Sequence, residues 1–544
     1  MAEENMKTLR AAQSFDSVDS DGSIKKPPQQ MSNVKLGLVL SGLWLSLFLC
    51  SLETTIVSTS IVHISNDLGE FSDASCIVVG YLLTYNAFIL IWSKLSDTFG
   101  TKWLLLLANG IFCVFSIACA VSKTMIQLIV FRAFQGIGGS GMYSVVFVVL
   151  AETVSMEKLG LCMGVMSSCF ALASLLGPIL GGVISDNSSW RWIFWLNVPC
   201  IALVFAVLAK FMDSPKSNQE IRSSLKRMDL VGALLSLAWA VPLIFALQEG
   251  GKTYGWNSGV IIGTLVTGVI MLVVFGFWQF WTYRKTCIDS ILPVHLFKKA
   301  KVVLAFVGMF FLGFTFYVSV IQIPQRFQQV NNTTATQAGI LLLPLTFISP
   351  LTSVFVGSAI GKHPLLAPGF VVAGGCLNLV GATLMSILPI DSTMPRAQFG
   401  YQVIFGISMG FMSALVYLIR VGVEKEDIAG AMGVGNMGRT LGGCIGLAVS
   451  GSIIQARLER DLPEFLNAQQ LKAIEASLSA ALGSLTEEQQ RRVREVFGEG
   501  FNSQFKGLMV SAGLSIIAAV WLYFAYRGLA KTRQIREKGP GTEA

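Results

Sequence analysis

The chain has 544 residues, of which 53% are hydrophobic and only 13% are charged, and its mean hydropathy is +0.63. A soluble protein carries about 25% charged residues, so this composition excludes an ordinary soluble domain and indicates a protein that crosses a membrane many times. The net charge of +8 therefore does not indicate nucleic-acid binding.

The chain begins with a polar stretch, residues 1–35, without the apolar core of a signal peptide, which predicts a disordered cytoplasmic tail. After it, apolar stretches of about 20 residues predict membrane-spanning helices. We expect fourteen spans, at residues 36–58, 75–96, 102–121, 125–150, 160–184, 192–213, 229–248, 258–281, 302–325, 337–360, 367–389, 398–420, 430–455 and 507–528. Residues 529–544 are predicted to be a second cytoplasmic tail.

Lys and Arg concentrate in every second loop, which places both termini in the cytoplasm because cytoplasmic loops are enriched in basic residues. Glycosylation sequons provide a separate indication of topology. They begin at Asn187, Asn331 and Asn332, and all three fall in loops predicted to face the other side.

The spans divide into two six-helix halves, residues 36–213 and 302–528, with two additional spans in the linker 214–301. Small residues recur every fourth position in span five (Ala173, Gly177, Gly181), and span thirteen repeats this pattern (Gly438, Gly442, Gly446). Paired repeats of this kind indicate a secondary transporter, although tight packing in an unrelated bundle is an alternative. The polar loop 456–506 predicts short amphipathic helices over the extracellular mouth.

Two ionisable residues stand inside apolar spans. Glu53 lies in the first span and Arg132 in the fourth. A charge inside a membrane is expensive and predicts a functional role. An acid that alternates between a buried environment and one beside a cation can bind and release a proton, and arginine keeps its charge throughout. The alternatives are that Glu53 is solvated at a span end and that Arg132 only binds a carbonyl.

Several of these stretches resemble motifs of the major facilitator superfamily, in particular of its fourteen-span drug/proton antiporters. Residues 171–182 resemble the fifth-helix antiporter motif G-x(3)-G-P-x(2)-G-G, with Ala173 in place of the first glycine. The run 190–199 (WRWIFWLNVP) resembles the start of the sixth helix. The matching residues of the antiporter motif are Gly177, Pro178, Gly181 and Gly182.

Other motifs of the same superfamily lie elsewhere in the chain. Residues 52–57 resemble the first-helix motif L-D-x-T-I-V with Glu53 replacing the aspartate, and RAFQGIGG (132–139) resembles the fourth-helix motif R-x-x-Q-G-x-G. Residues 93–102 resemble the signature loop between spans two and three, and residues 436–449 resemble R-T-x-G-G-x-x-G. Among the matching residues are Arg132, Gln135, Asp97, Gly100, Lys102 and Arg439.

The resemblance implies an all-α polytopic membrane protein with the major facilitator fold, working as a proton-coupled antiporter. It implies export of drugs, toxins or secondary metabolites, and the loops resemble those of fungal members. The implied roles are proton coupling for Glu53 and Arg132, conformational gating for Asp97, Gly100 and Lys102, and substrate or cavity contacts for Gln135 and Arg439.

We expect the proton gradient as the energy source without a cofactor, a lipid bilayer and a small molecule as partners, a monomer, and a location in the cell membrane or, alternatively, the vacuolar membrane. The sequence offers no nucleophile–base pair for an enzyme, and His63, His295 and His363 lie too far apart to predict a metal site. An uptake carrier, for example for iron–siderophore complexes, and a non-transporting sensor are the two alternatives.

Overall fold

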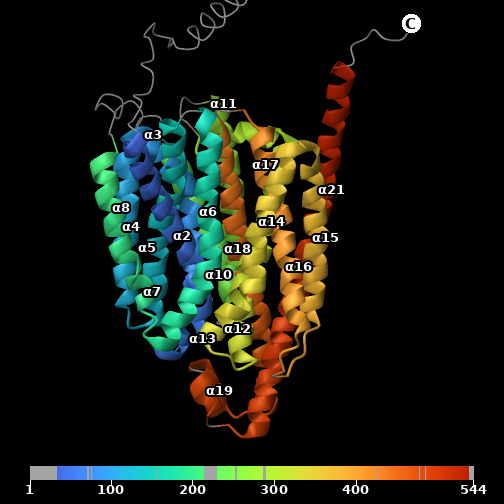
Figure 1. Ribbon diagram of the computed structural model, residues 1–544. Helices are drawn as coiled ribbons and strands as arrows, with labels where there is room; N and C mark the ends of the chain where they lie inside the picture. The colour runs from blue at the N-terminus through green and yellow to red at the C-terminus, as the bar shows by residue number, and fades with distance from the viewer. Residues whose placement is uncertain are drawn as a thin grey trace, which may run out of the picture.

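The computed structural model describes residues 33–69, 73–74, 76–154, 156–212, 229–250, 254–285, 290–391, 393–424, 427–476, 478–483 and 485–537. These residues form a bundle of long helices (Figure 1). Fourteen helical segments among them are long and apolar enough to cross a bilayer, which confirms the predicted number. Residues 1–32 of the predicted N-terminal tail (1–35) and residues 538–544 of the predicted C-terminal tail (529–544) lie outside the described residues. Residues 213–228, which include the first part of the linker, also lie outside them.

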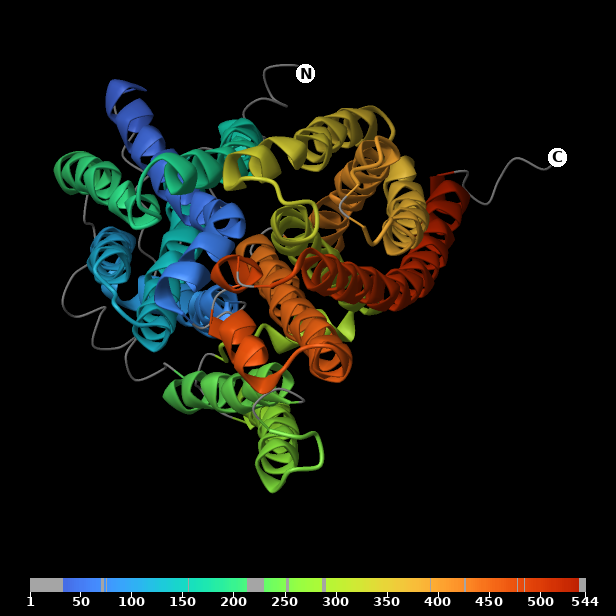
Figure 2. The same ribbon diagram turned by 90° about the horizontal axis from the view of Figure 1, so that it is seen from below.

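Six spans form the first group of helices, and they occupy one side of the bundle (Figure 2). The sixth span is broken into two helices near Leu196. The helices are α2 (Asn33–Leu68), α3 (Cys76–Phe99), α4 (Thr101–Ala120), α5 (Met125–Thr153), α6 (Met156–Asn187), α7 (Trp192–Trp195) and α8 (Asn197–Phe211).

The second group of six spans lies on the other side of the bundle (Figure 2). Its helices are α12 (Ala300–Gln329), α13 (Ala335–Leu341), α14 (Leu343–Lys362), α15 (Ala367–Ser386), α16 (Ala397–Met412), α17 (Ala414–Gly422), α18 (Ile428–Asp461) and α21 (Glu487–Glu537). The two linker spans, α10 (Leu230–Glu249) and α11 (Gly259–Lys285), form a pair at the edge of the bundle, where α10 packs against α3 and α18. Short 3-10 turns are η2 (Val294–Lys298), η3 (Pro364–Leu366) and η5 (Leu462–Glu464).

Glycines bring the first and fifth spans of each group together. A methyl group at Gly177 would collide with the side chain of Thr55, and one at Gly181 would collide with the backbone carbonyl of Ile56. In the second group, Gly442 of α18 lies equally close to the backbone of α12. Glycine at these positions allows backbones to approach each other, which is how helices pack in lipid. The spacing noted in the sequence therefore has the same structural use in both groups.

At one end of the bundle the chain builds a small helical subdomain outside the spans. It contains η5, α19 (Ala468–Ala476), α20 (Leu478–Leu482) and the first turns of α21, which meet around a separate apolar core that includes Leu458, Ile474, Val493 and Phe497. We call this end the α19 end (Figure 1). The expectation that 456–506 forms only separate short helices is wrong in part, because α18 extends to Asp461 and α21 already begins at Glu487.

Candidate functional site

The two ionisable residues predicted inside the spans meet in the interior of the first group. Arg132 of α5 forms an ion pair with Glu53 of α2, and their side chains are 0% and 1% exposed. The alternative that Glu53 is solvated is therefore wrong. Arg132 also donates from Nε to the carbonyl oxygen of Ile77 at 3.3 Å, so the carbonyl contact exists beside the ion pair. Such a pair is expensive to bury unless further hydrogen bonds satisfy both charges.

Those further hydrogen bonds come from two uncharged side chains, Asn197 and Gln135, and a third, Ser116, accepts from both of them. Asn197, the first residue of α8, donates from Nδ2 to Glu53 Oε2 at 2.8 Å and to Ser116 Oγ at 3.1 Å. Gln135 accepts from Arg132 Nη1 at 2.8 Å and donates to Ser116 Oγ at 2.7 Å. All three are buried, so Gln135 is part of the ion-pair network and does not line an open cavity. We call these five residues the ion-pair network.

Aromatic rings complete the surroundings of the guanidinium group. Its carbon lies 4.4 Å from the ring centroid of Tyr81 and 5.7 Å from that of Phe194. A cation over an aromatic face is stabilised by the ring quadrupole, most strongly where water is excluded. One nitrogen of Arg132, Nη2, has no hydrogen-bond partner among the described residues. The site thus holds a cation whose main charged partner is a single carboxylate that a proton would neutralise.

A line of polar and aromatic side chains leads from the ion-pair network to the second group of helices. The Tyr81 hydroxyl lies 3.7 Å from Cys50 Sγ, and its ring packs beside Tyr85 with the centroids 5.9 Å apart. Asn436 of α18 donates to the Tyr85 hydroxyl at 3.3 Å and accepts from Arg439 Nη2 at 3.2 Å. Arg439 therefore lies at the contact between the two groups. It is connected to the ion pair through Asn436, Tyr85 and Tyr81.

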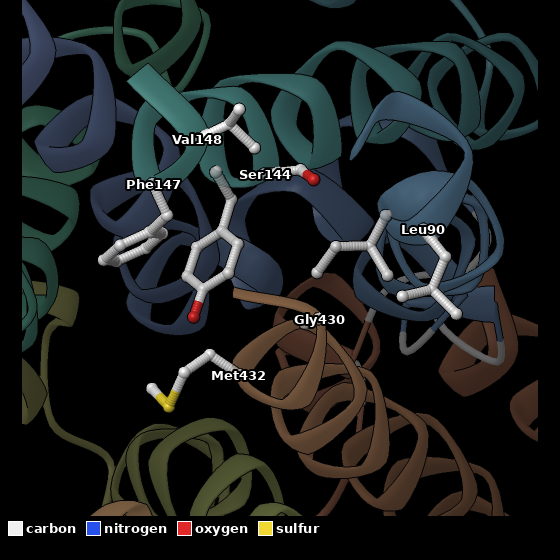
Figure 3. Close-up of a pocket in the computed structure, with 9 residues that line it drawn as sticks. Leu90, Ser144, Phe147, Val148, Gly430 and Met432 are labelled. Carbon is white, nitrogen blue, oxygen red and sulfur yellow. The ribbon is translucent and has the colours of Figure 1, made fainter. Parts of the chain in front are cut away.

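An apolar pocket lies between the two groups (Figure 3). It reaches the first turns of α18, the end of that helix opposite the α19 subdomain. Side chains of α3 and α5 form two of its walls, and the first turns of α18 form the third. Apart from the hydroxyls of Tyr143 and Ser144 its lining is apolar. The lining residues are Ile89, Leu90, Tyr143, Ser144, Phe147, Val148, Gly430, Met432 and Gly433.

At the α19 end the two groups are in direct contact. Asp186 at the end of α6 accepts hydrogen bonds from the backbone amides of Ala335 and Thr336, at 3.1 and 2.7 Å, and so caps the start of α13. Gly182 packs against the same turn, and Gly339 packs against the backbone of α6, each without room for a methyl group. The glycines of the antiporter-like motif therefore allow α6 to pack closely against α2 of its own group and against the start of α13 in the other group.

The signature loop between spans two and three is described in part. Gly100 has a φ of +88°, a left-handed conformation that favours glycine. Lys102 donates from Nζ to the carbonyl oxygen of Ala209 at 2.8 Å and ties the start of α4 to the end of α8. The side chain of Asp97 lies outside the described residues, so its predicted gating role stays a prediction.

The remaining predicted positions are separate from the ion-pair network. His63 and His295 face Asp186 and Asp427, at 3.6 and 2.8 Å. A group of three potential metal ligands does occur elsewhere (Asp73, Cys76, Glu249), although each of these residues also has other interactions.

The three sequons share the α19 end. Asn187 ends α6, and Asn331 and Asn332 lie between α12 and α13. Asn187 and Asn332 are exposed, whereas Asn331 donates to the carbonyl oxygen of Thr393.

The sequence prediction missed two members of the ion-pair network, Ser116 and Asn197. The signal for Asn197 was present, because it stands in the run 190–199 that resembles the start of a sixth helix. Ser116 is one of many small hydroxyl residues in the spans, and its sequence surroundings do not distinguish it.

These features define a membrane transporter: a polytopic helical bundle, two similar groups of six spans, a contact between the groups at one end, and a buried ion pair. The family model of the Major Facilitator Superfamily matches residues 43–447, and the chain belongs to this superfamily.

Relatives with known names are fungal transporters. The chain is 39% identical to "MFS-type transporter FPY5" of Fusarium mangiferae over 90% of this chain and 83% of that protein. It is 30% identical to "MFS-type transporter astH" of Aspergillus oryzae (84% and 81% covered) and 30% identical to "Aspyridones efflux protein" of Neocamarosporium betae (79% and 76% covered).

Solved structures show the same fold at low sequence identity. A bacterial homolog of the human lysosomal transporter Spinster, in an inward-facing and unoccupied conformation, superposes with a TM-score of 0.64 at 16% identity. The match covers 92% of this chain and 99% of that one.

Proposed function

We propose that this transporter exports small hydrophobic or amphipathic compounds, such as drugs, toxins or secondary metabolites, in exchange for protons. The observation that carries the proposal is the buried ion pair between Glu53 and Arg132. An ionisable pair inside a membrane bundle is costly, and proton relays are a main reason why such pairs persist. The name of one relative, "Aspyridones efflux protein", supports export as the direction.

In the proposed cycle Glu53 carries the proton and Arg132 is the fixed charge. While Glu53 is ionised, it holds α2 to α5 through Arg132 and to α8 through Asn197. A proton on Glu53 removes the negative charge and with it most of the attraction to the guanidinium. The contacts among α2, α5 and α8 then weaken. In the proposed cycle this change reaches the second group through Tyr81, Tyr85 and Asn436, and one group rocks against the other around the midplane.

The proposed substrate site is the pocket between the groups. Because its walls come from α3, α5 and α18, movement of one group against the other changes its shape. An apolar lining binds apolar surface without a strict hydrogen-bond code. The pocket has a volume of only about 30 Å³ in this conformation, so a small hydrophobic compound would enter only after the two groups have moved apart. One proton entering is worth about 2.3 kcal/mol per 100 mV and sustains a concentration ratio of at least ~40-fold.

The proposed orientation places the α19 end outside the cell and both termini in the cytoplasm, as the distribution of Lys and Arg indicates. We infer a monomer in the cell membrane, with the vacuolar membrane as the alternative. Enzymatic removal of N-glycans tests the orientation: we expect a mobility shift that Asn331→Gln leaves intact, because Asn187 and Asn332 are the exposed sequons. The variant that lacks both Asn187 and Asn332 is expected to lose the shift, and a wild type without any shift would contradict the orientation.

Proteoliposomes with the purified protein test the function. A panel of hydrophobic cations and fungal-type metabolites is loaded, and substrate flux and internal pH are followed together. We expect substrate to move in the direction opposite to the flow of protons. Glu53→Gln, which keeps the shape but removes the charge, is expected to abolish the coupled proton movement. Glu424→Gln is the matched control, because that carboxylate is 76% exposed.

Unchanged coupled transport by Glu53→Gln would refute the role of the ion pair. Substrate that moves in the same direction as the protons would identify an uptake carrier instead. A panel without any flux would favour the sensor alternative.

A further inference from the structure

The second group of helices contains a buried cation of its own, near the end of α12. Arg326 is 1% exposed, and its Nη2 donates to the carbonyl oxygen of Pro389 at 2.6 Å. Its Nε and Nη1 have no hydrogen-bond partner among the described residues. Arg132, the buried cation of the first group, has one nitrogen without a partner but pairs with the carboxylate of Glu53, whereas Arg326 has two such nitrogens and no ion-pair partner among the described residues.

No described acidic side chain lies within ion-pair distance of Arg326. The acid that acts on it electrostatically is Asp391, which is exposed and accepts hydrogen bonds from Thr393 of its own loop. Charges that are buried in proteins are paired or bound to an ion, because a buried unpaired charge is strongly destabilising. The guanidinium of Arg326 thus lacks the partner that such a position requires.

Arg326 belongs to a polar stripe along α12. The opposite face of this helix carries Gly313 and Tyr317, which pack against α18. Three further members of the stripe each have a polar atom without a partner: Ser319 Oγ, Gln322 Oε1 and Gln329 Nε2. The stripe repeats every three or four residues, is buried throughout, and consists of Thr315, Ser319, Gln322, Arg326 and Gln329.

The helices beside α12 also bury polar groups without partners. Both amide atoms of Gln398 and of Gln402 on α16 are unsatisfied, and so are Gln504 Oε1 and the hydroxyl of Ser511 on α21. α12 packs against both of these helices. Buried polar atoms in proteins are almost always satisfied by protein, water or an ion. Their number here indicates a hydrated interior in this group of helices.

We propose that this interior is an anion-binding site centred on Arg326, which takes a small monovalent anion such as a halide or a carboxylate group. The two unpartnered nitrogens of Arg326, Nε and Nη1, and the amide of Gln329, one turn further along the same face, supply donors, and water satisfies the remaining acceptors. The site is distinct from the ion-pair network, because it lies in the other group of helices and no acid in the described part of the chain forms an ion pair with Arg326.

Binding of radioactive chloride to the purified full-length protein tests the site. Sodium gluconate replaces sodium chloride as the chloride concentration is varied, so that the ionic strength stays constant. We expect saturable binding of about one chloride ion per chain. Arg326→Gln is expected to bind at least roughly tenfold more weakly, because a hydrogen bond to a charged group is lost. Arg396→Gln is the matched control, since this arginine is exposed at the start of α16 and leaves the stripe intact. Thermal unfolding in chloride and in gluconate provides a second measurement.

Chloride is expected to raise the unfolding midpoint of the wild type and of Arg396→Gln, but not that of Arg326→Gln. Competition by acetate would identify a carboxylate-compatible site, and competition by halides alone an inorganic-anion site. Equal binding by wild type and Arg326→Gln would overturn the proposal. If Arg326→Gln does not fold, the wild type decides, because an absence of saturable chloride binding also overturns it.

Discussion

The hydrogen bonds that Asp186 accepts from the first backbone amides of α13 hold the two groups of helices together at the α19 end. Asp186→Ala removes both acceptors of the amides of Ala335 and Thr336, at 3.1 and 2.7 Å. Hydrogen bonds to a charged group contribute about 1.5–3 kcal/mol each, and an anion at a helix start adds 0.3–1 kcal/mol. Because the Asp186 side chain is 18% exposed, water competes, and about 2 kcal/mol is a reasonable total. This total is roughly a 30-fold shift of the population toward an open α19 end.

Pulsed electron paramagnetic resonance between two spin labels measures this shift. The labels are placed at Val183 on α6 and Ile340 on α13, which are 40% and 50% exposed, in a background without reactive native cysteines. We expect a longer-distance population in Asp186→Ala and a smaller one in Asp186→Asn, which keeps one acceptor. Glu464→Ala, an exposed carboxylate at the same end, is the control. An unchanged distance distribution in Asp186→Ala would refute the reasoning.

Two further predictions concern stability, measured as unfolding of the purified protein. Glu53→Gln and Arg132→Gln are each expected to lower the free energy of unfolding by about 3–5 kcal/mol, because each leaves a buried charge unpaired. The double variant is expected to lose clearly less than the sum of the two single variants. Additive losses would contradict a direct ion pair. Gly181→Ala is expected to destabilise by about 1–3 kcal/mol through collision with the carbonyl of Ile56. Gly263→Ala, which enters open space, is expected to be neutral, and an equal loss in both would contradict close packing of α2 and α6.

The spans were predictable because the bilayer imposes a length and a composition that are visible in a single sequence. Glu53 and Arg132 were predictable for the same reason, since a charge is conspicuous inside an apolar span. The helix α21 shows where this reasoning stops. Hydropathy indicates where lipid begins, but backbone hydrogen bonds continue past that point, so the polar residues 487–506 extend the last span without a break.

The partners of the ion pair were not predictable in the same way. Asn197 and Ser116 are uncharged, and their importance comes from the position that the fold gives them beside Glu53. Arg326 lies near the end of a predicted span, where a basic residue normally reaches water. Only the packing of the neighbouring helices shows that its side chain is buried.

The length of α21 has a mechanical consequence. Its 51 residues form one rod of about 76 Å, whereas the hydrocarbon core of a bilayer is only about 30 Å thick. The rod is anchored at one end in the core of the α19 subdomain through Val493 and Phe497, and it packs along α12 and α15 within the bundle. A tilt of ~10° within the membrane would displace the far end of the outer ~30 Å by ~5 Å. A small rotation of α21 within the membrane would therefore produce a larger displacement of the α19 subdomain, and we expect a fluorescent dye on α19 to detect it.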